Sequence, residues 1–234
     1  MRLDRFLAET GFGTRTEVKK IIRTGVVTIN GVPAIKPDVH IDCEKDTVYV
    51  NGETVIYRKF IYLMLNKPAG YVSATWDKKL PTVLDLVPEE FLHFEPFPVG
   101  RLDIDTEGLL VLTNDGALSH RLLSPKSHVP KTYIAKIDIP VTDDDIQAFR
   151  NGLTLDDGYI TMPAELKIIQ NDICNAEITI QEGKFHQIKR MFESVGKKVL
   201  YLKRIKMNEL QLDEALDSGE VRELSGEELN MLKN

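Results

Sequence analysis

A run of four large apolar residues, Leu109 to Leu112, most limits how this chain of 234 residues can fold, because it predicts a buried strand. The run ends the stretch PVGRLDIDTEGLLVLTNDG, which extends from Pro98 to Gly116 and carries Asp103 shortly before the strand. A buried strand does not need a carboxylate just before its first residue. A solvent-exposed loop does not need Arg101 and Leu102 directly before such a carboxylate. Asp103 is therefore a candidate functional residue.

The other apolar segments predict strands and helices in an irregular order. We expect strands at 61–67, at 71–74 after a break at Pro68–Gly70, and at 109–115, 131–140 and 175–183. Helices are expected at 142–152, 186–196 and 225–233, the last with a capping box formed by Ser225 and Glu228. Strands interrupted by helices in this way indicate an α+β fold rather than a regular series of βαβ units.

The first 58 residues predict a small separate unit. Its first helix would bury Leu3, Phe6 and Leu7 and stop at Gly11–Gly13, and its second would begin with a capping box of Thr14 and Glu17. Strands follow at 26–34 and 46–55, each containing an Asn-Gly turn signal. Residues 57–60 are a predicted linker, so we expect one domain at 1–58 and a larger one at 59–234.

The charge of the chain is unevenly distributed. The formal net charge is −6, which alone argues against a nucleic-acid partner, but residues 1–36 carry a net charge of +4 and residues 181–206 a net charge of +6. Such segregation predicts a basic face that could bind phosphates, with an acidic surface elsewhere. The alternative is ordinary solvated charge on helix surfaces.

Several classes of function are not supported by any motif. The chain has no Gly-x-Gly-x-x-Gly, no Gly-Lys-Ser/Thr phosphate loop and no Gly-x-Ser-x-Gly, and its five histidines lack metal-ligand spacing. We therefore expect neither a cofactor nor a metal. The two cysteines are far apart in sequence, no segment approaches the length of a transmembrane helix, and no secretory signal begins the chain. These features predict a cytoplasmic protein with reduced thiols and no membrane association.

The opening segment, RLDRFLAETGFGTRTEVKKIIRTGVVTING, resembles an S4 domain, the αL-type RNA-binding module of a ribosomal protein. Two short helices displaying basic side chains, followed by small strands, carry the resemblance. It implies binding to structured RNA through phosphates, for which the candidate residues are Arg15, Lys19, Lys20 and Arg23. The alternative is a small helical cap with solvated charges.

Four further motifs resemble those of pseudouridine synthases, and they occur in the same order: NKPAGYVSA, GRLDIDTEGLLVLTNDG, KTY and EGKFHQIKRM. The resemblance is to the branch that carries an S4 domain and acts on ribosomal RNA, and within it to the synthases of small-subunit (16S) rRNA. It implies a catalytic domain with a mixed, mainly antiparallel sheet flanked by helices. It also implies a monomer that isomerises uridine in 16S rRNA or in a pre-ribosomal small-subunit particle. The same reaction on 23S rRNA, or RNA binding in ribosome assembly without catalysis, are the alternatives.

The resemblance also implies roles for individual residues. Asp103 corresponds to the catalytic carboxylate, which either attacks C1′ of the ribose or removes a ribose proton. Tyr133 corresponds to the residue that stacks on the target uracil, Lys189 to the basic residue that keeps the aspartate ionised, and Arg101 to a position that reaches toward the displaced RNA. The alternatives are a turn or capping role for Asp103, a core role for Tyr133 and a solvated position for Lys189. Further expectations are a turn or cap role for Asp105 and Asp115, a structural role for His186, and a strand-ending turn at 66–70.

Overall fold

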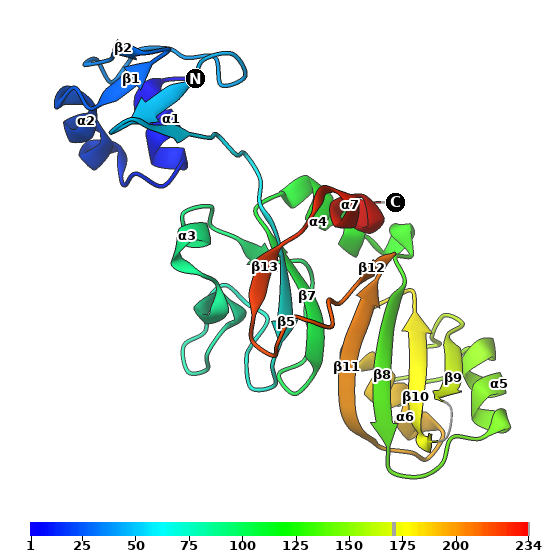
Figure 1. Ribbon diagram of the computed structural model, residues 1–234. Helices are drawn as coiled ribbons and strands as arrows, with labels where there is room; N and C mark the ends of the chain where they lie inside the picture. The colour runs from blue at the N-terminus through cyan, green and yellow to red at the C-terminus, as the bar shows by residue number, and fades with distance from the viewer. Residues whose placement is uncertain (170–171, 234) are drawn as a thin grey trace. The chain divides into compact units, whose positions relative to one another are not determined.

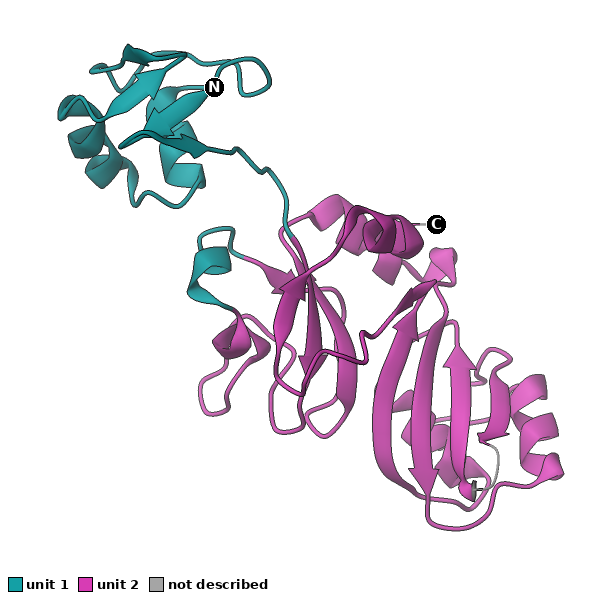
Figure 2. Cartoon of the chain, viewed as in Figure 1, with its two compact units in different colours: residues 1–61, 88–95 teal, residues 62–87, 96–234 magenta. Residues whose placement is uncertain are grey.

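The computed structural model describes residues 1–169 and 172–233. The chain forms two compact units, one made of residues 1–61 and 88–95 and the other of residues 62–87 and 96–234 (Figure 2). The domain boundary expected between residues 58 and 59 stays a prediction. No helix in the described part of the chain is long and apolar enough to cross a membrane.

The first unit packs two helices on a small antiparallel sheet with the strand order β2-β1-β3-β4 (Figure 1). Its core contains the side chains expected from the helical pattern, including Leu3, Phe6 and Leu7, together with Val18 and Ile22. The elements are α1 (Leu3–Glu9), α2 (Arg15–Arg23), β1 (Val27–Ile29), β2 (Val32–Pro33), β3 (Val48–Val50), β4 (Glu53–Val55) and, in segment 88–95, α3 (Glu89–Leu92).

Local sequence signals determine the ends of these elements. The Thr14 and Glu17 capping box is present at the start of α2, as predicted. Asn30 and Gly31 both have positive φ angles, 52° and 80°, and join β1 to β2. Asn51 and Gly52 do the same between β3 and β4. Positive φ at both central positions is the requirement of the type I′ turn that Asn-Gly favours.

The second unit is built on a nine-stranded sheet, mixed and mainly antiparallel as expected, with helices around it (Figure 1). The main strand order is β13-β5-β7-β11-β8-β10-β9, and among the described strands β7 and β11 are the pair that runs in parallel. The strands are β5 (Tyr62–Lys67), β6 (Phe97–Pro98), β7 (Glu107–Thr113), β8 (Lys131–Ile137), β9 (Glu165–Ile169), β10 (Asp172–Ile180), β11 (Val199–Met207), β12 (Leu210–Gln211) and β13 (Val221–Glu223).

The helices of this unit begin largely at residues that the sequence marks as caps. Thr142 caps α5, Asp115 caps α4 through the amide of Leu118, and Ser225 exchanges hydrogen bonds with Glu228 at the start of α7. In Figure 1, α6 lies behind β8 and β10, and α5 lies beside β9. The helical elements are η1 (Val83–Leu86), α4 (Gly116–Leu123), η2 (Pro125–Ser127), α5 (Asp143–Asn151), α6 (Gln187–Ser194) and α7 (Gly226–Lys233).

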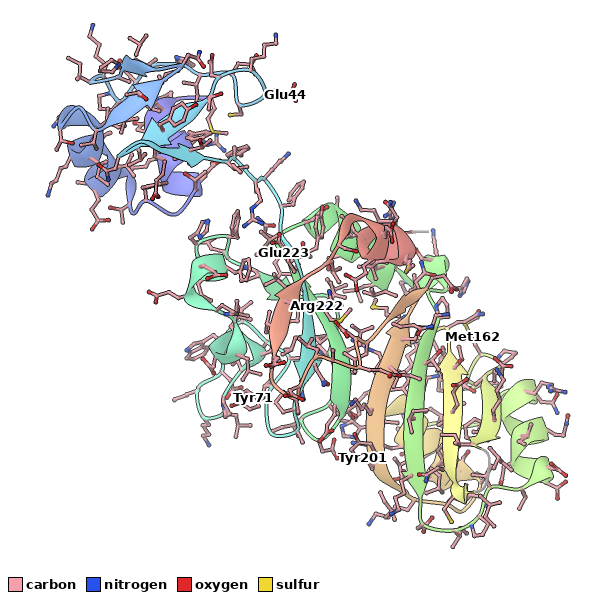
Figure 3. The ribbon with its side chains drawn as sticks, viewed as in Figure 1. Glu44, Tyr71, Met162, Tyr201, Arg222 and Glu223 are labelled. Atoms are coloured by element: carbon pink, nitrogen blue, oxygen red, sulfur yellow. The ribbon has the colours of Figure 1, made fainter. Side chains whose placement is uncertain are left out.

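Strand β7 is the buried strand that the apolar run predicts. Every residue from Gly108 to Thr113 is buried, because β5 and β11 pair with its two edges and side chains cover both faces. A Cβ at Gly108 would lie 2.2 Å from the carbonyl oxygen of Arg204 on β11, so only glycine allows this parallel pair to approach. Tyr201 of β11, labelled in Figure 3, donates a hydrogen bond of 2.8 Å to Glu107 at the start of β7.

One predicted strand is wrong. Segment 71–74 makes only an isolated bridge between Val72 and Thr82, because the chain turns away after Gly70 instead of continuing along the sheet. The carboxylate of Asp77 then holds the next turn by accepting hydrogen bonds from the amides of Lys79 and Leu80. The sequence analysis also missed β9, β11 and β13 and the helix α4.

Candidate active site

Asp103 lies on the loop between β6 and β7. A buried lysine, Lys67, donates hydrogen bonds to the backbone of this loop. The Lys67 side chain is at the end of β5 and has no exposed surface. Its ammonium lies 2.9 Å from the carbonyl oxygen of Thr106, 3.2 Å from that of Asp103 and 3.4 Å from that of Ile104, and it also donates to Pro68 at 3.0 Å. A single cation therefore holds the backbone of Asp103 and of the residues that follow it in the loop.

The turn after β5 adds further contacts to the same loop. The Ser73 hydroxyl donates to the carbonyl oxygen of Leu102 at 2.9 Å and accepts from its amide at 3.1 Å. The Gly70 amide donates to the carbonyl oxygen of Ile104 at 2.7 Å. The segment 66–70 is a strand-ending turn, as expected, and together with Ser73 it forms the support of the Asp103 loop.

The Asp103 carboxylate is 28% exposed and faces two side chains from the region of α6. The Lys189 ammonium lies 3.3 Å from one carboxylate oxygen, and Nε2 of His186 lies 3.8 Å from the other. The same ammonium approaches Asp105 more closely, at 2.6 Å. The structure thus brings Asp103 and Lys189 together, as the sequence analysis expects, and adds Asp105 and His186 to the cluster.

Charge pairing dominates the electrostatics of this cluster. Burial lowers the pKa of Lys189, but the hydrogen bond to Asp105 and the charges of Asp103 and Asp105 outweigh burial and raise the pKa above its ordinary value. Burial raises the pKa of Asp105, and the hydrogen bond and charge of Lys189 reverse that effect and lower it. Lys189 is therefore a cation, and Asp105 a carboxylate, at neutral pH.

Glu182 fixes the turn that leads into α6 and thereby places Lys189. Its carboxylate accepts hydrogen bonds from the Tyr159 hydroxyl at 2.6 Å, the Met162 amide at 2.9 Å and the Gln187 side-chain amide at 2.7 Å. Gln187 in turn accepts from the amide of Lys184 at 2.9 Å. His186 has a left-handed backbone, with φ of 48°, and comes directly before the first residue of α6.

Tyr133 and Arg101 share a small pocket with this cluster. Tyr133 is on β8 and is 7% exposed, whereas the Arg101 side chain is exposed at the rim. The pocket has a volume of about 70 Å³ and is lined by Arg101, Leu102, Asp103, Thr106, Tyr133, Ile180, Gly183, Lys184, His186, Gln187, Ile188, Lys189 and Leu202. All four sequence-predicted residues of the larger domain, Asp103, Tyr133, Lys189 and Arg101, therefore lie around one cavity.

The basic candidates of the first unit do not form a single cluster. Arg15 and Lys19 line a hollow of about 570 Å³ together with Arg2, Arg5 and His40, among others. Lys20 and Arg23 lie on the same helix and are exposed, but they do not line this hollow. Arg2 pairs with Asp4 at 2.9 Å and Arg5 with Glu9 at 2.6 Å, so acidic neighbours partly offset the charge of these two arginines.

Sequence reasoning missed the roles of three residues in the larger site. Lys67 was expected only as part of a turn, Asp105 as a turn or cap residue, and His186 as structural. The order Asp103, Asp105 and Lys189 in the sequence gives no sign that the two carboxylates share one ammonium, because the lysine comes from a helix more than 80 residues later. Among the described residues, no three His, Cys, Asp or Glu side chains gather closely enough to hold a metal ion.

The arrangement offers a carboxylate held beside a cation at the edge of a pocket that contains an aromatic ring. Such a carboxylate can act as a nucleophile or as a base, and the ring can stack on a planar heterocycle. The exposed and basic rim around Arg101 and Lys184 suits a polyanion.

Comparisons with known proteins agree with this chemistry. Residues 61–194 match the family of RNA pseudouridylate synthases, and residues 1–48 match the S4 domain. An uncharacterized RNA pseudouridine synthase of Bacillus subtilis is 52% identical over 234 residues, which is 99% of this chain and 98% of that protein. Ribosomal small subunit pseudouridine synthase A of Escherichia coli is 38% identical over 230 residues, covering 98% of each chain.

A solved structure leads to the same assignment. The crystal structure of a pseudouridylate synthase superimposes with a TM-score of 0.70 at 39% sequence identity, and it covers 99% of both chains. The family match includes the loop that carries Asp103, the strand that carries Tyr133 and the helix that carries Lys189. The chain is a member of the RNA pseudouridylate synthase family, with an S4 domain at its N-terminus and a pseudouridine synthase domain after it.

Proposed function

We propose that this enzyme converts one uridine of 16S ribosomal RNA to pseudouridine, with Asp103 as its catalytic carboxylate. The observation that carries the proposal is the placement of Asp103, Lys189 and Tyr133 around one pocket in a chain whose relatives include several synthases named for the small ribosomal subunit. We further propose uridine 516 as the target, as in the synthase type that the chain resembles.

The reaction suits a site with one free carboxylate. The bond between uracil N1 and ribose C1′ breaks, the base turns, and C5 bonds to C1′; the C5 hydrogen leaves as a proton, and N1 takes up a proton. No atoms are gained or lost apart from this exchange of hydrogen, so the reaction needs no net oxidant or water. Glycosidases place two carboxyl groups across the scissile bond because they must also activate water. Asp105 lies near Asp103, but the Lys189 ammonium binds it at 2.6 Å, so Asp105 is engaged in an ion pair.

The other residues have supporting roles in this proposal. Lys189 holds the Asp103 carboxylate through an ion pair of 3.3 Å, and Tyr133 stacks on the target uracil once that base has left the RNA stack. Arg101, exposed at the rim, contacts the RNA that remains outside. Cations on α2 bind phosphates of the same RNA; the candidates are the exposed Arg15, Lys20 and Arg23 and the half-buried Lys19. The proposal implies a monomer that works in the cytoplasm, where ribosomal RNA is assembled into subunits.

The test is to map pseudouridines in 16S and 23S rRNA from cells with and without the protein. We expect one pseudouridine of 16S rRNA to disappear with the protein, to return with the wild-type chain and not to return with Asp103→Asn. Asp103→Asn should still fold and bind RNA, because the amide keeps the size of the side chain and loses only its charge.

Three outcomes would contradict the proposal in different ways. A pseudouridine lost from 23S rRNA would move the substrate to the large subunit. No change in either RNA would favour a ribosome-assembly protein that does not catalyse. Full restoration by Asp103→Asn would remove Asp103 from the chemistry.

A further inference from the structure

An exposed aromatic pair stands at the rim of the active-site pocket. The Phe185 side chain is 70% exposed, although burial of a phenylalanine ring removes a large apolar surface from water. Its ring stacks on the imidazole of His186, with centroids 3.7 Å apart and an interplanar angle of 19°. The two rings lie face to face, with His186 as the inner ring and Phe185 as the outer ring, so the outer face of Phe185 is a flat exposed surface.

The inner ring belongs to the site already described. His186 lines the pocket, and its Nε2 lies 3.8 Å from Asp103. The left-handed backbone of His186, an uncommon conformation for a residue other than glycine, comes just before α6 and is held by the Glu182 and Gln187 hydrogen bonds. The Phe185 carbonyl oxygen also accepts a hydrogen bond from Arg190 on α6. The aromatic pair is therefore attached at the backbone to the same helix that carries Lys189.

The surroundings of the pair favour a polyanion rather than an apolar partner. Lys184 precedes Phe185 and lines the pocket together with the exposed Arg101, whereas Lys189 and Arg190 on α6 are paired with acidic side chains. Lys184 places its ammonium over the ring of Tyr159, 4.7 Å from the centroid, at the same turn. A flat aromatic surface within a basic region is the combination that binds unpaired nucleobases, in which each stacked base contributes about 1–3 kcal/mol.

We propose that the exposed face of Phe185 stacks on a nucleobase that is the immediate neighbour of the target uridine in the substrate RNA. The inference rests on the proposed function, because it requires the target to enter the pocket beside Asp103. When a base leaves the stack, each of its neighbours loses a stacking partner. A neighbour is joined to the target by a single phosphodiester, so it must lie near the rim where Phe185 stands. Phe185 then replaces the lost contact and offsets part of the unstacking energy.

The test is a cycle that combines changes in the protein with changes in the RNA. The RNA is a transcript of the 16S region around the mapped uridine, made intact or with an abasic nucleotide directly 5′ or directly 3′ of the target. Equilibrium binding and single-turnover pseudouridine formation are measured for wild type, Phe185→Ala, Phe185→Leu and Phe185→Tyr. On intact RNA we expect Phe185→Ala to weaken binding about 5- to 160-fold, the range that corresponds to about 1–3 kcal/mol.

The cycle separates stacking from other effects of the mutation. Phe185→Tyr keeps the ring and should bind like wild type, whereas Phe185→Leu keeps apolar volume without an aromatic face and should resemble Phe185→Ala. With one of the two abasic RNAs, wild type and Phe185→Ala should bind equally, because the stacking partner is missing. Ile173→Ala is the matched control: Ile173 is 55% exposed at the far end of β10 from Ile180, about 23 Å away along the strand, and its loss should change nothing.

The outcomes distinguish the two levels of the argument. If wild type forms pseudouridine in the intact transcript but Phe185→Ala loses equal affinity on all three RNAs, or loses none on the intact one, the stacking inference is wrong and the proposed function stands. If mapping in cells finds no pseudouridine that depends on the protein, the proposed function fails and the inference fails with it.

Discussion

Replacement of the buried Lys67 by methionine should separate the stability of this protein from its activity. Methionine has a similar length and no charge, so it fills the space and removes the ammonium that holds the Asp103 loop. The carbonyl oxygens of Asp103 and Ile104 keep a second donor each, the amides of Thr106 and Gly70. The carbonyl oxygens that lose their hydrogen-bond donor in Lys67→Met are therefore mainly those of Pro68 and Thr106.

The magnitudes of two opposing effects decide the result for stability. A buried carbonyl that loses its partner costs about 1–3 kcal/mol, so two of them cost about 2–6 kcal/mol. Against this, burial lowers the pKa of Lys67 from 10.5 to about 8. At about 1.4 kcal/mol for each pKa unit, the fold loses roughly 3 kcal/mol by keeping this lysine charged at neutral pH. Methionine removes that penalty, so the net change in the free energy of unfolding should be within about 3 kcal/mol.

Activity has no such compensation. The Asp103 carboxylate must hold its position relative to the substrate, and a displacement of about 1 Å can lower a rate about 10²-fold. We expect Lys67→Met to reduce the single-turnover rate by that factor or more. The rate is followed as release of tritium from uridine labelled at C5, and stability is followed by urea unfolding.

Lys131→Met is the matched control for the Lys67 variant. Lys131 is a half-buried lysine, and burial lowers its pKa to about 8, but its ammonium donates to Val129 and not to the Asp103 loop. Between pH 8 and 10.5 each of these lysines binds fewer protons in the folded state than in the unfolded state. The free energy of unfolding of the wild type therefore rises with pH in that window, and each methionine variant should lack the contribution of its lysine. A Lys67→Met enzyme with the wild-type rate, or a Lys131→Met enzyme equally impaired, would refute the assigned role of the Lys67 ammonium.

Three further measurements test other parts of the molecule. Tyr133→Phe should bind RNA normally and, if the ring alone matters, keep its rate within about tenfold of wild type. Tyr133→Ala should have a low rate on either account. Wild-type single-turnover rates for Tyr133→Ala would leave Tyr133 a core residue only. Replacement of Arg15, Lys19, Lys20 and Arg23 by alanine should lower the slope of log K against log salt by roughly 3–4 if about four phosphates are neutralised there, and an unchanged slope would show that this face does not touch RNA. Arg222, on β13 (Figure 3), lowers the pKa of Glu228 to about 2 through its hydrogen bonds. The pair therefore stabilises the fold above pH 4.5, by at most about 3 kcal/mol. This stabilisation is lost as the pH falls toward 2. The stability difference between wild type and Glu228→Gln should shrink over that range, and a difference independent of pH would contradict the assignment.

Local signals in the sequence were sufficient where a residue and its partner are neighbours in the chain. The capping boxes at Thr14 and Ser225, the Asn-Gly turns and the buried strand β7 all depend on contacts within a few residues. They could be predicted because a capping side chain or a turn conformation is chosen by its own short segment. The order of the predicted strands and helices gave the α+β fold, and the linker after the first unit gave the expectation of two domains. The resemblance to a family added the mixed, mainly antiparallel sheet, which no single segment determines.

Strand β11 was missed because its partners lie far away in the sequence. Its segment contains Lys203, Arg204 and Lys206, and this density of charge favours a surface helix or a loop. In the structure Arg204 is 2% exposed, and its Nε donates to the carbonyl oxygen of Leu109 on β7 at 2.8 Å. A buried arginine in a central strand is tolerated here because a backbone acceptor, about 95 residues earlier in the chain, partly replaces its contacts with water.

Asp105 and Asp115 show the same limit within the active-site region. Both are aspartates near the ends of β7, and both were expected to cap or to turn. Asp115 does cap, because its acceptor role is filled by the amide of Leu118 three residues away. Asp105 lies in the turn between Asp103 and Thr106, as expected, and it also pairs with Lys189, which only the packing of α6 against the sheet brings within reach. The residue type was the same, and the tertiary neighbour determined the role.

The choice of lysine at position 189 has a consequence for the division of work between the two carboxylates. An arginine fork can hold one carboxylate through two parallel hydrogen bonds, whereas an ammonium is a point charge that several acceptors can share. Here the ammonium is closest to Asp105, at 2.6 Å, and stands 3.3 Å from a single oxygen of Asp103. The positive charge thus acts on both groups while the hydrogen bond of shortest length goes to Asp105. The other oxygen of Asp103 faces the pocket. Nε2 of His186 lies 3.8 Å from that oxygen. A carboxylate that is held near a cation but not clamped by it retains its reactivity toward a substrate atom, and that is the property the proposed role of Asp103 requires.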